Sequence, residues 1–84
     1  LKDRELQAYY EATLDMFTDK GWKYLIEDLQ QVEATVNTLE GVKTQTDVDY
    51  RRGQLDILRY VMARPQTLQA AYELLLEQDN DAAV

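Results

Sequence analysis

Apolar residues recur at intervals of three and four along most of the chain, which is the spacing of one face of an α-helix. The first set predicts a helix over about residues 2–16. Its apolar face consists of Leu6, Tyr10, Leu14 and Phe17. Asp3 and Glu5 lie near the start of this helix, where acidic side chains suit the positive end of the helix dipole.

The segment FTDKGW marks the start of a second predicted helix, over about residues 18–40. Thr18 is a favourable N-cap, and Phe17 and Trp22 occupy the positions of a hydrophobic staple. The apolar residues that follow keep a heptad spacing for about two and a half repeats. They are Trp22, Leu25, Leu29, Val32, Val36 and Leu39. We expect Gly41 to be the glycine that ends this helix.

A third helix is predicted over about residues 46–63, after the loop VKTQTD. Either Thr44 with Asp47 or Thr46 with Asp49 can cap its start. We expect the helix to stop before Pro65, because the residue before a proline avoids the helical region.

A weaker apolar pattern predicts a fourth helix over about residues 67–78, with Thr67 as a candidate N-cap. Alternatively, Pro65 is its first residue, where the missing N–H costs nothing. Its apolar face consists of Leu68, Ala71, Tyr72, Leu75 and Leu76. We expect the end of the chain to fray from about residue 79.

The predicted fold is therefore all-α, a single helical domain over residues 1–84. Short loops favour antiparallel packing of successive helices. We expect a small antiparallel bundle in which the second and third helices form a long central hairpin. The shorter first and fourth helices flank it.

The third helix carries an arginine within its apolar arc. At about 100° per residue, the apolar side chains span roughly half of the helix surface, and Arg51 and Gln54 fall inside that half. Such an arc is wider than one neighbouring helix can cover, so we expect two neighbours or an external partner. Arg51 either packs its stem while its guanidinium reaches water or a carboxylate such as Glu33 or Glu40, or it selects a partner together with Gln54.

Tyrosines and arginines supply the other candidate contacts. Tyr24 and Tyr60 project away from the apolar seams, as interface aromatics or as half-buried boundary residues. Arg52 and Arg59 form part of a possible anion-binding strip, although ion pairs at helical spacing, such as Asp56–Arg59, explain most of it. The candidate partner-contact residues are Tyr24, Tyr50, Arg51, Gln54, Arg52, Arg59 and Tyr60.

Composition narrows the chemistry. The chain of 84 residues has no cysteine and no histidine, which removes thiolate chemistry, disulfides, the commonest general base and the commonest metal ligand. We therefore expect no enzyme, no cofactor and no metal. The net charge of −7 disfavours nucleic acid as a partner. No apolar run of about 18 residues and no leader pattern is evident, so we expect no membrane association.

Two motifs carry a resemblance to known proteins. Residues 16–29 read MFT-x-x-GWK-x-L-x-E-D-L, and residues 50–58 read Y-R-x-GQLD-I-L. With the segment between them they resemble a group of small acidic helical proteins of tailed bacteriophages, most of which lack an assigned activity. The resemblance covers a little over half of the chain. It implies a setting in the virion or the host cytoplasm, and it transfers no catalytic residues.

Three functional hypotheses follow. The first is a non-enzymatic phage protein that binds another virion protein of the head or the portal–tail region through its helical faces. The second is a phage effector that binds and inhibits a host enzyme, such as RNA polymerase or a nuclease, through its acidic surface. Carboxylates at Glu73, Glu77, Asp79 and Asp81 support it, although a solvated acidic tail is the preferred explanation of these residues. The third is a homo-oligomeric helical protein without a phage connection, which uses its heptad seam for self-association.

Overall fold

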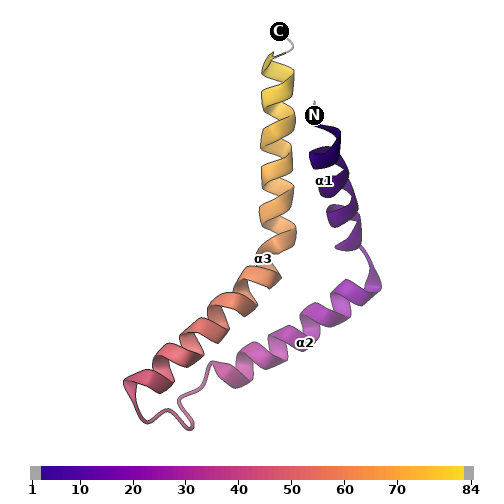
Figure 1. The fold of residues 1–84 in the computed structure, drawn as a ribbon. Coiled ribbons are helices and arrows are strands. Elements are labelled where there is room, and N and C mark those ends of the chain that lie inside the picture. Colours follow the sequence, from indigo (N-terminus) through magenta and orange to yellow (C-terminus); the bar gives the residue numbers. More distant parts are fainter. Residues whose placement is uncertain (1–2, 83–84) are drawn as a thin grey trace.

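The computed structural model describes residues 3–82, which fold into three helices (Figure 1). Helix α1 spans Arg4–Met16, α2 spans Lys20–Val36 and α3 spans Gln45–Ala82. The predicted all-α class is confirmed. The predicted arrangement of four helices is wrong, because the third and fourth predicted helices are one continuous helix of 38 residues.

Pro65 lies inside α3 and does not end it. It does not begin a separate helix either. A proline in a helix interior removes one backbone hydrogen bond and its ring crowds the preceding turn, so it bends the helix instead. Figure 1 shows that α3 bends near its middle and that its two halves lie beside different helices. Packing of α2 and α1 on these halves offsets the local cost of the proline.

The bend divides the molecule into two arms. The α1 arm consists of α1 and residues 65–82 of α3, and the α2 arm consists of α2 and residues 45–64 of α3. The principal dimensions are 59 × 29 × 17 Å, and the radius of gyration is 17.8 Å. A compact domain of this length has a radius of gyration of about 12 Å. The chain is therefore an elongated pair of helical pairs, and the predicted small antiparallel bundle of four helices is not confirmed.

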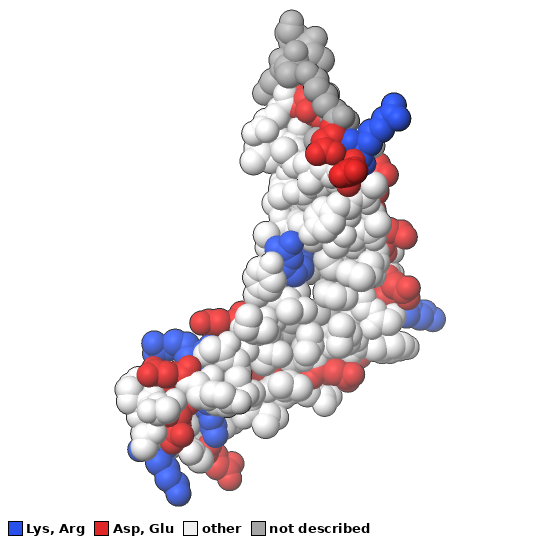
Figure 2. Space-filling view, in the orientation of Figure 1, with Lys and Arg blue, Asp and Glu red and all other residues white. Residues whose placement is uncertain are grey.

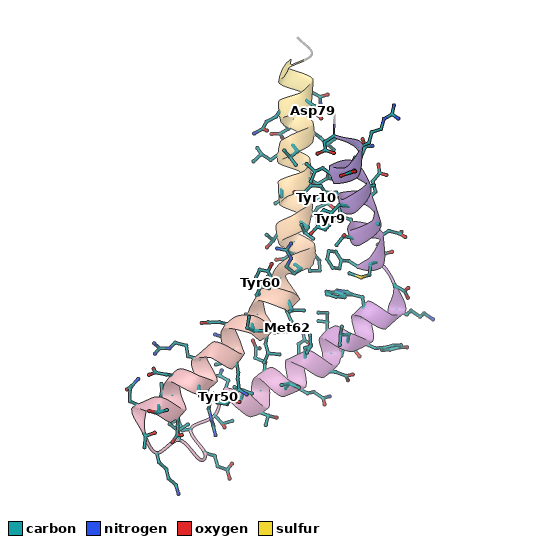
Figure 3. The ribbon with its side chains drawn as sticks, viewed as in Figure 1. Tyr9, Tyr10, Tyr50, Tyr60, Met62 and Asp79 are labelled. Carbon is teal, nitrogen blue, oxygen red and sulfur yellow. The ribbon has the colours of Figure 1, made fainter. Side chains whose placement is uncertain are left out.

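Helix α1 ends at Met16, as predicted, and begins at Arg4, whereas the predicted start at residue 2 lies outside the described residues. Its N-cap is Asp3, whose carboxylate accepts hydrogen bonds from the backbone N–H groups of Glu5 and Leu6 at 3.0 and 3.1 Å. On the predicted apolar face, Tyr10 is buried, and its ring stacks on that of Tyr72 with centroids 5.2 Å apart. Figure 3 shows Tyr10 between α1 and α3. This contact joins the α1 arm.

The N-cap of α2 lies one residue later than predicted, and the helix spans Lys20–Val36 instead of about residues 18–40. Asp19 is its N-cap and accepts from the N–H of Gly21 at 3.2 Å, whereas the hydroxyl of Thr18 donates to the carbonyl of Asp15 at 2.7 Å. Thr18 as N-cap is therefore wrong. The expected contact between Phe17 and Trp22 does form, with ring centroids 4.7 Å apart.

The C-terminus of α2 lies at Val36, four residues before its predicted end. Asn37 leaves the helical region, and the hydroxyl of Thr38 donates to the carbonyl of Thr35 at 3.1 Å. Such side-chain bonds to the backbone compete with helix continuation. Gly41 consequently lies in the loop, with φ +80°, and is not the glycine that terminates the helix.

The start of α3 follows the first of the two predicted caps. The hydroxyl of Thr44 accepts from the N–H of Asp47 at 3.2 Å, and the carboxylate of Asp47 accepts from the N–H of Thr44 at 3.1 Å. This reciprocal pair is a capping box. The same carboxylate also accepts from the N–H of Lys43 at 3.0 Å. The backbone hydrogen bonds from Lys43 and Thr44 lower the pKa of Asp47 below its ordinary value of 3.8. At the other end, α3 continues to Ala82, beyond the predicted limit at 78.

The hydrophobic core is small. Among residues 3–80, whose side chains the structure describes, only Tyr10 and Leu68 are buried, at 9% and 5% exposure. Both belong to the α1 arm. In the α2 arm the interhelical side chains are at best half-buried, so this arm has an unusually open interface for a helical hairpin.

We expect Leu68→Ala to lower the free energy of unfolding by about 2–4 kcal/mol, because it removes a buried side chain from a thin core. Urea unfolding followed by circular dichroism measures it. Leu74→Ala is the matched control, since Leu74 is 55% exposed on the same arm, and it should change stability by less than about 0.5 kcal/mol. Equal losses in the two variants would contradict this core assignment.

The lowered pKa of Asp47 predicts a pH-dependent contribution of the capping box. A carboxyl whose folded-state pKa lies below its unfolded value stabilises the fold at pH values above the unfolded value. That contribution is lost as the pH falls from 3.8 through the lower folded-state pKa. We expect Asp47→Asn to be less stable than the unaltered chain at pH 7, with the difference shrinking below pH 3.8. A constant difference across this range would contradict the prediction.

Candidate protein-binding groove

An open apolar groove runs between α2 and the first half of α3. Its volume is about 650 Å³. The lining residues are Val32, Val36, Asp49, Tyr50, Gly53, Gln54, Ile57 and Leu58. Asp49 is the one charged residue in this lining, so the groove is a hydrophobic surface with little chemistry of its own.

On α2, the groove arises because the predicted heptad seam is divided between two surfaces. Alternate seam residues, Trp22, Leu29 and Val36, are half-buried. Of the intervening residues, Leu25 and Val32 are 45% and 46% exposed, whereas Leu39, at 88% exposure, lies in the loop after α2. An apolar seam that a single neighbouring helix covered fully would bury both sets. One flank of the seam therefore packs against α3, and the other flank forms an exposed apolar stripe.

The apolar arc of α3 is divided in the same way. Leu55, Leu58 and Met62 are half-buried, and Figure 3 shows Met62 between α3 and α2. Tyr50 and Ile57, one heptad apart on the other side of the arc, are 70% and 65% exposed. The arc is indeed wider than one neighbour covers, and α2 covers only one side of it. The second neighbour that the sequence predicts is not among residues 3–82.

Arg51 is held within the chain, where it fastens the loop between α2 and α3. One guanidinium nitrogen, Nη1, donates to the carbonyl of Thr38 at 2.6 Å and to its hydroxyl at 3.1 Å. The other, Nη2, donates to the carbonyl of Glu40 at 2.6 Å. The planar fork of arginine suits two acceptors at fixed separation. The predicted carboxylate partner is therefore wrong, because Arg51 binds the main chain of Glu40 and not its side chain.

Gly41 allows this close approach. Its φ of +80° is a conformation that side-chain-bearing residues rarely adopt. A Cβ at this position would also lie 3.1 Å from Nη2 of Arg51, a tight contact. The loop geometry and the arginine clamp thus depend on each other.

The remaining candidates lie apart from the groove or at its edge. Tyr50 and Gln54 line the groove. Arg59 forms an ion pair with Glu33 at 3.1 Å across the α2–α3 interface, in place of the predicted pair within its own helix. The guanidinium of Arg64 lies 4.9 Å from the ring centroid of Tyr60, a cation–π contact. Tyr24 is 60% exposed and Arg52 is exposed, and neither lines the groove.

Sequence reasoning did not single out Val32, Val36, Gly53, Ile57 and Leu58 as site residues. Their signal was present, because apolar residues at heptad spacing on both helices exceed what one pair of helices can bury. The sequence could not show which flank of each stripe stays exposed. That depends on how the two helices are rotated about their axes.

The described residues show neither a metal-binding cluster nor a membrane-spanning helix. Residues 3–82 contain no cluster of three or more acidic side chains that could hold a metal ion. The same part of the chain has no helix that is long and apolar enough to cross a membrane. No protein-family model matches the sequence, and comparisons with curated proteins and with solved structures find no match.

We expect Arg51→Gln to lower the free energy of unfolding by about 1–2 kcal/mol, because two charge-assisted contacts to main-chain carbonyls are lost. Arg51→Lys should recover only part of the loss, since an ammonium cannot reproduce the fork. Arg52→Gln is the control and should stay within about 0.5 kcal/mol. Hydrogen exchange at residues 37–43 would locate the effect. Unchanged protection of this loop in Arg51→Gln would contradict the conclusion that Arg51 holds the loop in place.

Proposed function

We propose that this chain is a non-enzymatic helical module of a bacteriophage particle that binds another protein molecule of the head or the portal–tail region. The observation that carries the binding function is the open groove of the α2 arm. The particle setting derives from the sequence resemblance of residues 16–29 and 50–58.

The groove has the properties of a helix-binding surface. Tyr50 and Ile57 are large, mostly exposed and one heptad apart, and the facing α2 wall consists of exposed Val32 and half-buried Val36. Interface cores are rich in aromatic and apolar residues and poor in charge. A partner helix can insert its apolar face between two such walls. Binding would also stabilise a chain that has few buried residues, by mass action.

A second candidate function is favoured by the distribution of charge. The α1 arm has seven acidic residues and one basic residue, whereas residues 17–64 have eight acidic and seven basic residues. Figure 2 shows mainly acidic residues along one side of the upper arm and mixed charges on the lower arm. An acidic arm supports an effector that binds a basic host protein. Such binding would weaken steeply with salt.

We expect affinity capture from phage-infected source cells to separate the two functions. The tagged chain should recover head, portal or tail proteins, and this recovery should persist at high salt because the groove is apolar. Tyr50→Ser with Ile57→Ser should abolish recovery, since truncation of central aromatic and apolar contacts commonly costs more than about 2 kcal/mol.

Tyr24→Ser is the matched control, because Tyr24 is a similarly exposed tyrosine outside the groove. It should leave recovery unchanged. Recovery of a host polymerase or nuclease that is lost at high salt, and kept by the groove variant, would overturn the particle function in favour of the effector.

A further inference from the structure

We propose that the occupant of the groove is a second copy of this chain, so that two α2 arms form a twofold-symmetric dimer with a four-helix bundle at its centre. The inference rests on the proposed function, because it names the partner at the same groove.

The two walls of the groove suit a self-complementary contact. On α2, Val32 lines the groove, and exposed Leu25 lies one heptad before it on the same face of the helix. On α3, Tyr50 and Ile57 line the groove and are exposed seven residues apart. Heptad stripes of this kind pack helices side by side in bundles. A twofold interface requires that one patch present both complementary halves. Each α2 arm presents two such stripes, and two copies together supply the four helices of a bundle.

Gly53 is the second observation, and it points to close approach by another backbone. It lies in the interior of α3 and lines the groove. A glycine there costs about 1 kcal/mol relative to alanine. Among the described residues, no atom beyond its neighbours and its own helix backbone lies within 4 Å of where its Cβ would be, so no described contact within one copy requires the glycine. A helix of a second copy packed against this point would require it.

The chain exposes more surface than a compact monomer of its mass, which is consistent with a dimer. The chain has an accessible surface of 6693 Å², whereas a compact monomer of this mass has about 5,200 Å². The excess of about 1,500 Å² exceeds the roughly 800 Å² that each partner contributes to a standard interface. A dimer through the α2 arms would bring the burial of this chain closer to that of an ordinary folded protein.

The distribution of charge favours a dimer contact through the α2 arms over a contact through the α1 arms. Residues 17–64 are almost neutral overall, and the α1 arm carries nearly all of the net negative charge. Two copies that meet through their α2 arms place near-neutral surfaces together. Like charges directly opposed across an interface would weaken it, and this arrangement leaves the acidic α1 arms outside the bundle.

The test is sedimentation equilibrium of the whole chain over a range of concentrations. We expect a dimer for the unaltered chain and a monomer, with at least tenfold weaker association, for Ile57→Ser. Ile57 is 65% exposed, so this variant should keep its helical circular dichroism. Tyr24→Ser and Leu74→Ser are matched controls with exposed apolar residues outside the groove, and both should remain dimers.

Gly53→Ala gives a sharper test, because its effects on the monomer and the dimer should have opposite signs. Alanine should raise the unfolding midpoint of the Ile57→Ser monomer, since the space is empty and helix propensity improves. In the otherwise unaltered chain it should weaken dimerisation by at least tenfold. Unchanged or stronger dimerisation would overturn the role of Gly53 and with it this interface.

A monomeric unaltered chain, or a dimer that Ile57→Ser leaves intact, would overturn the inference. If the unaltered chain is a monomer, the proposed function still stands provided that capture of a virion protein depends on Tyr50 and Ile57. If capture of a virion protein does not depend on Tyr50 and Ile57, but the dimer does depend on the groove, the particle function is overturned and the dimer stands. The two failures are therefore distinguishable.

Discussion

The bend of α3 is the constraint on which the rest of the structure depends. One long helix serves as the packing surface for both α1 and α2, and Pro65 directs its two halves along different lines. If α3 were straight, α1 and α2 would pack against it at different angles. The proline therefore acts here through tertiary packing, because α1 and α2 stabilise a helix that its local sequence would interrupt.

The two arms use this helix differently. In the α1 arm, Tyr10 and Leu68 are buried and the Tyr10–Tyr72 stack joins the helices. In the α2 arm, polar contacts across the interface accompany incomplete apolar packing. The clamp of Arg51 on the loop and the Arg59–Glu33 pair fix the register of the hairpin while one apolar flank stays open. The α1 arm is thus the more self-contained of the two, and the α2 arm retains surface for a partner.

Small domains have a low free energy of unfolding, because a short chain buries a small fraction of its surface. The elongated shape of this chain lowers the buried fraction of its surface further. Association through the α2 arm would offset it, since any species that binds only the folded chain adds to its stability. Binding and folding are then expected to be linked, which gives an exposed apolar groove a structural role as well as a functional one.

Much of the local structure follows from the sequence alone. The three- and four-residue periodicity predicts that the chain is helical over most of its length, and the Thr44–Asp47 pair that caps α3 is one of the two caps that the sequence offers. The excess apolar width of α3 is also evident from its sequence, because helical geometry converts spacing directly into angle. These features depend on neighbours along the chain.

The remaining features depend on neighbours in space, and only the tertiary structure decided them. Local rules end a helix at Pro65, but packing on both halves of α3 kept it continuous. The partners of Arg51 required the path of a loop that turns at Gly41. The exposed flank of each stripe required the rotation of α2 against α3. Periodicity determines that an apolar face exists, whereas the crossing of two helices determines which part of that face is covered.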